Sequence, residues 1–371
     1  MDKEFKLKTH WKTQITQVHC GIDFALSEKL PALLDEEERK VVIITDTHVE
    51  KLYHTQMEHL DVKIFSFPAG EASKTRETKS MLEDHLLSHN FGRDSLIIGL
   101  GGGVVGDVTG FLAANYCRGI AHIQIPTSLI AMVDASIGGK TAVNTAYGKN
   151  MIGAFYPPEA VWIDGAFLAT LPQKQKKSGI VEMIKAGLIE SPSLFDSMKE
   201  NVDKWETHDL EFIMDRIYES VTIKRDIVED DPEEEKGSRR ILNFGHTFGH
   251  ALEMLEDYQI DHGEAVAIGI LVASFISNKM GLLPKEAFDK VREIFQLYQI
   301  PLKISMQHSL DDWMSALALD KKALKGTPRL VLLEEIGRVA PFNGNFCSEV
   351  EFPLLEEAIT WIYEQFCHSP K

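Results

Sequence analysis

Cysteine and long apolar runs are scarce in this sequence. Its 371 residues include four cysteines, Cys20, Cys117, Cys347 and Cys367, and no two of them form a CxxC pair. Cysteines this scattered predict neither a disulfide framework nor a thiolate zinc site, and they favour reduced thiols in the cytoplasm. The longest apolar run, residues 265–276, is too short to span a bilayer and predicts a buried helix instead.

Positive charge is also in short supply. The chain has 39 Lys and Arg against 56 Asp and Glu, which gives a formal net charge of −17. This acidity argues against nucleic acid or an anionic membrane as the general partner. The first residues, MDKEFK, have mixed charge and no apolar stretch, unlike a secretory signal peptide. We therefore expect a cytoplasmic protein that binds neither nucleic acid nor a membrane.

The first part of the chain alternates strand-like and helix-like segments. Compact β-branched runs such as VVIITD at 41–46 are typical of central parallel strands. The alternation predicts an α/β fold with a doubly wound, Rossmann-like parallel sheet. The expected strands are 14–20, 41–46, 62–67, 95–100, 122–125 and 161–164, and the expected helices are 24–34, 49–60, 75–90 and a segment ending at 114.

Long amphipathic helices replace this alternation from about residues 172–178 onward. We therefore predict two domains, an α/β domain over 1–175 and a mainly helical domain over 176–371. The acidic run 229–236 is expected to be a solvated loop. The expected helices are 179–190, 193–203, 208–229, 244–256, 263–280, 284–297, 313–319 and 353–367, and one strand pair is expected at 329–334 and 337–341.

A glycine-rich turn follows the expected strand at 95–100. Gly101, Gly103 and Gly106 satisfy G-x-G-x-x-G between a strand and a helix, a geometry that places a phosphate on backbone N–H groups. A standard Rossmann site also has an acidic residue about 20 positions later, and the next strand has none. A nucleotide site is one interpretation and a tight structural turn is the other. Asp46 and Glu71 also follow strands, so we expect them to share one ligand with this turn.

Three histidines, His246, His250 and His262, lie close together in the sequence among glycines. The first two are four residues apart and share one face if the segment is helical. Three imidazoles, or two with a carboxylate, would leave an open coordination position on a catalytic zinc. The alternative is that these histidines are ordinary core residues.

One helical turn separates Glu182 from Lys185. A surface ion pair is the default interpretation of this spacing. The surrounding segment, GIVEMIKAG, is mostly apolar and favours a buried functional pair.

Together these motifs resemble the 3-dehydroquinate synthase family, of the sugar phosphate cyclase superfamily. The matching segments cover most of the span 95–330 and a weaker one, GEASK, precedes them at 70–74. The resemblance implies that family's fold, with NAD bound by the first domain and a metal and the substrate by the second. The matching segments are GGGVVGDVTGFLAANYCRG, QIPTSLIAMVDASIGGKTAVN, GKNMIGAFYPP, SGIVEMIKAG, RRILNFGHTFGHALE, HGEAVAIG and DKK.

The resemblance assigns Glu182, His246 and His262 as ligands of a zinc or cobalt ion. His250, which spacing alone would make a ligand, becomes a substrate contact. The implied NAD contacts are Asp46, Glu71, Lys74, Gly102, Gly103, Val104, Val105, Gly106, Asp107, Thr127, Ser128, Lys140, Lys149, Phe167 and Thr170.

The implied substrate pocket is rich in cations. Lys140, Asn150, Lys185, His250 and Asp134 are the implied catalytic residues. Arg118 is expected to reach the phosphate across a homodimer interface. The remaining substrate contacts are Lys149, Lys224, Arg239, Asn243 and one of Lys321 or Lys322.

Two positions depart from the family pattern. Ser128 stands where threonine is usual, and a hydroxyl remains. The loop between Lys224 and Arg239 is one residue longer than usual, around Pro232. Neither change removes a chemical role.

The implied reaction converts 3-deoxy-D-arabino-heptulosonate 7-phosphate, a sugar-acid phosphate, into 3-dehydroquinate and phosphate in the shikimate pathway. It combines transient oxidation by NAD, phosphate elimination, re-reduction and an intramolecular aldol closure. Three alternatives remain at this stage: a sedoheptulose 7-phosphate cyclase, a metal-dependent alcohol or glycerol dehydrogenase, and a binding protein with a structural metal.

Overall fold

Six parallel strands form the central sheet of the N-terminal half. The computed structural model describes residues 14–319 and 327–367. The strand order is β1-β8-β5-β4-β2-β3 and every paired strand is parallel, which confirms the predicted doubly wound sheet. The strands are β1 (Gln17–Gly21), β2 (Val41–Asp46), β3 (Lys63–Phe67), β4 (Leu96–Gly101), β5 (Ala121–Pro126) and β8 (Ala160–Asp164).

Helices cover both faces of this sheet, so the central strand β4 is apolar and buried along its whole length. The expected helix 49–60 is wrong as one element, because it breaks at Tyr53, whose φ of −112° and ψ of 18° are not helical. The N-terminal helices are a π-helical turn at Ala25–Lys29, α1 (Leu30–Glu36), α2 (Thr47–Leu52), α3 (His54–Met57), α4 (Arg76–Ser88) and α5 (Gly103–Asn115).

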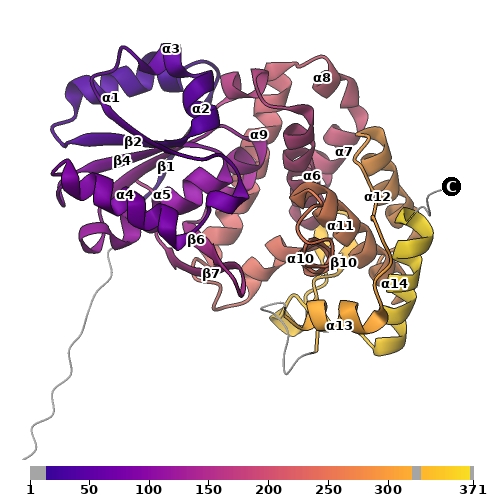
Figure 1. Cartoon of the computed structure of the whole chain (residues 1–371). Helices are drawn as coiled ribbons and strands as arrows, with labels where there is room; N and C mark the ends of the chain where they lie inside the picture. The colour runs from indigo at the N-terminus through magenta and orange to yellow at the C-terminus, as the bar shows by residue number, and fades with distance from the viewer. Residues whose placement is uncertain (1–13, 320–326, 368–371) are drawn as a thin grey trace, which may run out of the picture.

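An antiparallel hairpin that was not predicted, β6 (Lys140–Thr145) and β7 (Gly148–Phe155), lies outside the main sheet. It packs closely on α5, because a Cβ on Gly110 would lie 2.3 Å from Thr141 Cγ2. Figure 1 shows the hairpin reaching toward the helical half. The hairpin therefore carries Lys140 and Lys149 to the boundary between the two halves.

The C-terminal half is mainly helical, as expected, and packs beside the sheet (Figure 1). Helix α11 is almost entirely buried, which confirms the expectation for the apolar run 265–276. The expected helix 193–203 is wrong as one element, since it breaks at Asn201. The helices are α6 (Gln173–Glu190), α7 (Pro192–Glu200), α8 (Val202–Glu206), α9 (Leu210–Asp230), α10 (His246–Leu255), α11 (His262–Lys279), α12 (Lys285–Leu297), α13 (Leu310–Ala318) and α14 (Phe352–Phe366).

The expected strand pair at 329–341 is only partly right. β10 (Leu333–Glu335) pairs with β11 (Arg338–Val339), whereas β9 (Arg329–Leu330) pairs with β12 (Ser348–Glu349). Among the described residues, no helix is both long enough and apolar enough to cross a bilayer.

Strand β5 buries a histidine completely. His122 is stacked on Tyr156, with ring centroids 5.6 Å apart, and neither ring nitrogen has a hydrogen-bond partner among the described residues. Burial lowers the pKa of His122 from 6.5 to about 3. The folded protein therefore keeps His122 neutral over a pH range in which the unfolded chain binds a proton there.

Acid should destabilise the protein through His122. Its contribution is complete above pH 6.5 and is lost as the pH falls toward 3, so from pH 7 to pH 5 it removes about 2 kcal/mol from the free energy of unfolding. Urea unfolding at both pH values measures this, with His122→Phe as the comparison. The same pH dependence in both proteins would contradict the assignment.

Candidate active site

The glycine turn lies at the carboxyl end of β4, beside the point where the order of the strands in the sheet reverses. β2 lies between β4 and β3, so the turn is a neighbour of Asp46 at the end of β2. Helix α5 begins at Gly103, and its N-cap, Gly102, provides no side-chain hydrogen bond to the first turn. The free N–H groups of this turn suit an anionic phosphate. A Cβ on Gly101 would lie 2.5 Å from Val105 Cγ2, so the turn excludes a side chain there.

Polar side chains on the neighbouring loops are fixed around this turn. Asp46 accepts hydrogen bonds from the backbone of His48 and Val49 and so caps α2. Lys74 forms a buried ion pair with Asp107 at 2.5 Å. Burial raises the pKa of Asp107, although Lys74 opposes the effect.

Several of the other predicted NAD contacts lie on loops that border the same carboxyl-terminal edge of the sheet. Asn144 donates from Nδ2 to Glu71 at 2.7 Å, which joins the hairpin to the loop after β3. Thr170 lies 2.6 Å from the Tyr53 hydroxyl, and Phe167 packs edge-on against the Tyr53 ring. Phe167 is buried, so its side chain contributes packing to this border. The backbone of Thr127, after β5, donates to the carbonyl of Gly101, which closes the turn from the other side.

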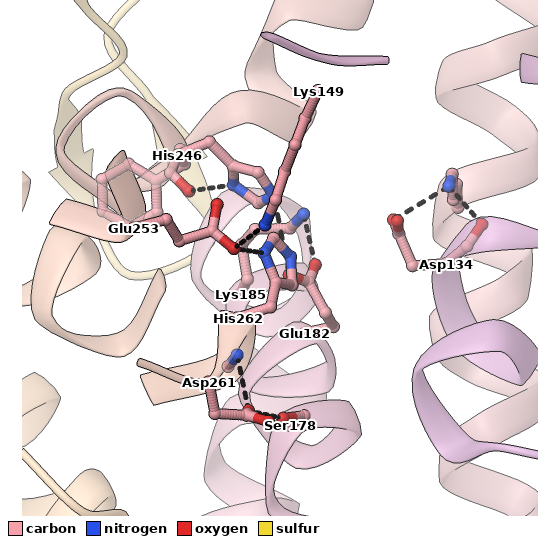
Figure 2. A network of polar contacts seen from close by, with 12 residues as sticks. Asp134, Lys149, Ser178, Glu182, Lys185, His246, Glu253, Asp261 and His262 are labelled. Atoms are coloured by element: carbon pink, nitrogen blue, oxygen red, sulfur yellow. Dashed lines mark hydrogen bonds and ion pairs between the residues drawn. The ribbon is translucent and has the colours of Figure 1, made fainter. Parts of the chain in front are cut away.

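The second cluster joins three helices of the C-terminal half. Glu182 lies on α6, while His246 and His262 are the first residues of α10 and α11. Glu182 Oε1 is 3.6 Å from His246 Nε2 and 3.8 Å from His262 Nε2. One potential ligand atom from each of the three lies within 4.8 Å of the other two (Figure 2).

The second nitrogen of each histidine ring is held by another group. His246 Nδ1 is 3.2 Å from the carbonyl of Phe244, and His262 Nδ1 is 3.4 Å from Glu253 Oε1. Both contacts favour a proton on Nδ1, which leaves each Nε2 lone pair directed at the shared position. Burial lowers the pKa of His246 well below its usual value, so this ring is neutral.

Glu182 supplies the negative charge of the cluster. Its carboxylate is buried, and Lys185 Nζ lies 2.5 Å from Oε2, so the two residues form the expected buried pair. The other oxygen, Oε1, accepts no hydrogen bond from any described residue. Two imidazole nitrogens and one carboxylate oxygen fit a divalent cation that keeps an open position.

Glycines allow the three helices to approach closely enough to form this cluster. A Cβ on Gly269 would lie 2.0 Å from the carbonyl oxygen of Gly245, where α10 meets α11. A Cβ on Gly263 would lie 2.4 Å from the Cα of Ser178 on α6. Asp261 caps α11 and also accepts a hydrogen bond from Ser178, which fixes the start of α11 beside α6.

The predicted substrate cations converge from both halves of the chain. Lys224 on α9 pairs with Asp134 at 2.8 Å. Burial raises the pKa of Asp134, but Lys224 and Lys185 outweigh it and keep the carboxyl ionised. Arg239 is buried and donates to the carbonyl of Gly138 at 3.0 Å.

Two acidic residues that were not predicted lie among these cations. Glu234 pairs with Lys140 at 2.5 Å and accepts from Asn243 at 3.2 Å. Glu253 pairs with Lys149 at 3.0 Å. Glu253 lies three and seven residues after His250 and His246, so helical spacing could have placed it on their face. Glu234 lies in an acidic run, where nothing in the sequence distinguishes it from its neighbours.

The expectation that the acidic run 229–236 is a solvated loop is only partly right, because most of the run is exposed but one of its carboxylates is buried. Asp231 is buried and accepts hydrogen bonds from the backbone amides of Glu235, Lys236, Gly237 and Arg239. A carboxylate with four donors organises the segment that carries both Glu234 and Arg239.

Three other predicted site residues, His250, Asn150 and Arg118, are exposed. His250 is exposed, with its ring centroid 5.3 Å from that of His246. Asn150 is exposed with φ of 55°, and its backbone N–H donates to Asn144. Arg118 is exposed beyond the far end of α5, roughly 20 Å along that helix from Gly103, so it does not join this chain's own cluster. Lys321 and Lys322 lie outside the described residues.

Removing the acceptor at Asp231 should loosen this loop. Asp231→Asn loses the charge and part of the acceptor capacity, and we expect the free energy of unfolding to fall by about 2 kcal/mol in urea titrations. Glu233→Gln is the matched control, because this residue of the same loop is exposed, and a change within about 0.5 kcal/mol is expected there. Equal effects of the two substitutions would contradict the role of Asp231.

Comparison with known proteins covers nearly the whole chain. A family model described as 3-dehydroquinate synthase N-terminal matches residues 64–178, and one described as 3-dehydroquinate synthase C-terminal matches residues 179–323. The chain is 40% identical to a 3-dehydroquinate synthase of Nitrosospira multiformis over 92% of this chain and 93% of that protein. It is 42% identical to that of Crocosphaera subtropica over 86% of this chain and 90% of that protein.

Solved structures share the architecture. A 2-epi-5-epi-valiolone synthase from Streptomyces hygroscopicus with NAD+ and Zn2+ bound is 26% identical, with a TM-score of 0.86 over 97% of this chain and all of the other. A 2-deoxy-scyllo-inosose synthase complexed with carbaglucose-6-phosphate, NAD+ and Co2+ is 29% identical, with a TM-score of 0.82 over 92% and 95% of the two chains. A probable glycerol dehydrogenase from Sinorhizobium meliloti, 15% identical with a TM-score of 0.61 over 94% and 97%, shares the fold alone.

Proposed function

The chain belongs to the 3-dehydroquinate synthase family, and from this membership we infer that it converts 3-deoxy-D-arabino-heptulosonate 7-phosphate into 3-dehydroquinate and phosphate. It is thus a carbon–oxygen lyase of the shikimate pathway, which leads to the aromatic amino acids. The observation that carries this conclusion is identity of about 40% with proteins of that name over most of both chains.

The cofactors of this activity are NAD and a zinc or cobalt ion. When bound, NAD accepts and returns a hydride, and the cation polarises the oxygen of the carbon that is oxidised. Glu182, His246 and His262 would hold the cation. The N-terminus of α5 at Gly102 and Gly103 would hold the dinucleotide phosphates.

The remaining residues of the site bind anions and hold protons. Lys140, Lys224 and Arg239 would neutralise the phosphate and carboxylate of the substrate, and so allow a chain of charge −17 to bind a multiply charged anion. His250 and Asn150 would hold or relay the proton lost when phosphate leaves. Lys185, fixed against Glu182, would position the substrate beside the cation.

The assembly and location are part of the same proposal. The family resemblance supports a homodimer in which Arg118 of a second copy would reach the phosphate, and within one chain Arg118 lies away from the cluster. The NAD-binding domain would comprise residues 1–175 and the metal- and substrate-binding domain residues 176–371. We propose that the protein is cytoplasmic and that its ligands are small molecules.

One assay tests the reaction against its rivals. Incubation with 3-deoxy-D-arabino-heptulosonate 7-phosphate, NAD+ and Zn2+ or Co2+ should release phosphate with no net formation of NADH, because the hydride is returned to the substrate. Turnover of sedoheptulose 7-phosphate instead would indicate the related cyclase. Net NADH from glycerol or another alcohol would indicate a dehydrogenase.

Two substitutions test the residue roles. His262→Ala removes a cation ligand and Lys140→Ala removes an anion-binding charge, and both should reduce kcat/KM at least about 1,000-fold with the fold retained by circular dichroism. Lys290→Ala, an exposed change on α12, is the control and should leave turnover unchanged. A zinc-loaded, active His262→Ala protein would contradict the ligand assignment.

A further inference from the structure

Glu253 contacts a histidine and a lysine that come from opposite halves of the chain. Its carboxylate is buried on α10, and the same oxygen, Oε1, lies 3.4 Å from His262 Nδ1 and 3.0 Å from Lys149 Nζ. Lys149 belongs to strand β7 of the hairpin, whereas His262 begins α11. Figure 2 shows Lys149 descending onto the Glu253 carboxylate, with His262 beside it.

We propose that Glu253 is a positioning residue that orients the cation ligand His262 and fixes Lys149 of the hairpin through one carboxylate. The inference rests on the proposed function, because it takes His262 as a ligand. It adds a residue that reaches the cation only through another side chain.

The two histidines of the cluster are oriented by different means. His246 is oriented by the backbone carbonyl of Phe244, which no side-chain substitution removes. His262 depends on Glu253, whose carboxylate favours the proton on Nδ1 and leaves Nε2 free toward Glu182.

Two residues hold Lys149, one in the last turn of α10 and one just after that helix. Its ammonium lies 4.3 Å from the ring centroid of Tyr258, in addition to its contact with Glu253. The side chain keeps 30% of its exposure, so it can still face a substrate. Glu253 thereby links the position of Lys149, a predicted substrate contact, to the orientation of His262, a predicted metal ligand.

Direct ligation by Glu253 is the competing arrangement. His250, Glu253 and His262 also offer three atoms within 4.8 Å of one another. That site would use Nδ1 of His262, the nitrogen that faces Glu253. It would leave the buried Oε1 of Glu182 without a partner, and an unpaired buried charge destabilises the fold. A positioning role uses Nε2 and satisfies both carboxylates.

Zinc affinity of the metal-free protein, measured by competition with a chromophoric chelator, separates these possibilities. Glu253→Gln should raise the Kd for Zn2+ about 10- to 100-fold, while His262→Ala should abolish binding. Glu256→Gln is the matched control, since Glu256 is a buried glutamate near the same helix end that contacts Ser305 instead. Its Zn2+ Kd should match the wild type. Glu253→Asp serves if the Gln variant does not fold.

A second measurement tests the link to Lys149. At saturating Zn2+, Glu253→Gln and Lys149→Met should each raise KM for the heptulosonate phosphate about tenfold, whereas only the Glu253 variant weakens Zn2+ binding. An unchanged Kd in folded Glu253→Gln overturns the positioning role alone. Loss of Zn2+ as complete as in His262→Ala overturns it in favour of direct ligation. A wild-type protein that binds no Zn2+ overturns the proposed site and this inference together.

Discussion

The Glu182 carboxylate is the constraint on which the helical half depends. A buried carboxylate is strongly unfavourable unless nearby positive charge compensates it. Lys185 supplies one such charge on the same helix, and the two imidazoles beside Oε1 are arranged to share a cation with it. Helices α6, α10 and α11 therefore meet around this one anion.

That arrangement places a steric demand on the backbone. Side chains at Gly245, Gly263 or Gly269 would meet main-chain atoms of the facing helix. These positions are therefore glycine for reasons of packing, while the histidines next to two of them provide the chemistry. This explains why histidines and glycines are neighbours in the sequence, since these side chains meet only where the helices approach closely.

Much of the fold followed from local sequence, and the exceptions have physical causes. β-branched runs and the glycine turn predicted the sheet and the start of α5, because burial on both faces leaves a strong signal. Hairpin β6–β7 carries mixed polar residues and pairs outside the main sheet, so periodicity did not reveal it. Glu234 was missed because a charge run resembles solvent-exposed loop, and only the fold brings it to Lys140.

The charges of the site also explain how an acidic chain keeps a basic pocket ordered. Lys140, Lys149 and Lys224 come from separate elements, and each already pairs with a carboxylate of this chain. Without these partners, the like charges would repel one another as they converged between the two halves. An anionic substrate must therefore compete with internal carboxylates for the same ammonium groups. Binding is then an exchange of one set of ion pairs for another, which favours ligands that match several cations at once over those that match only one.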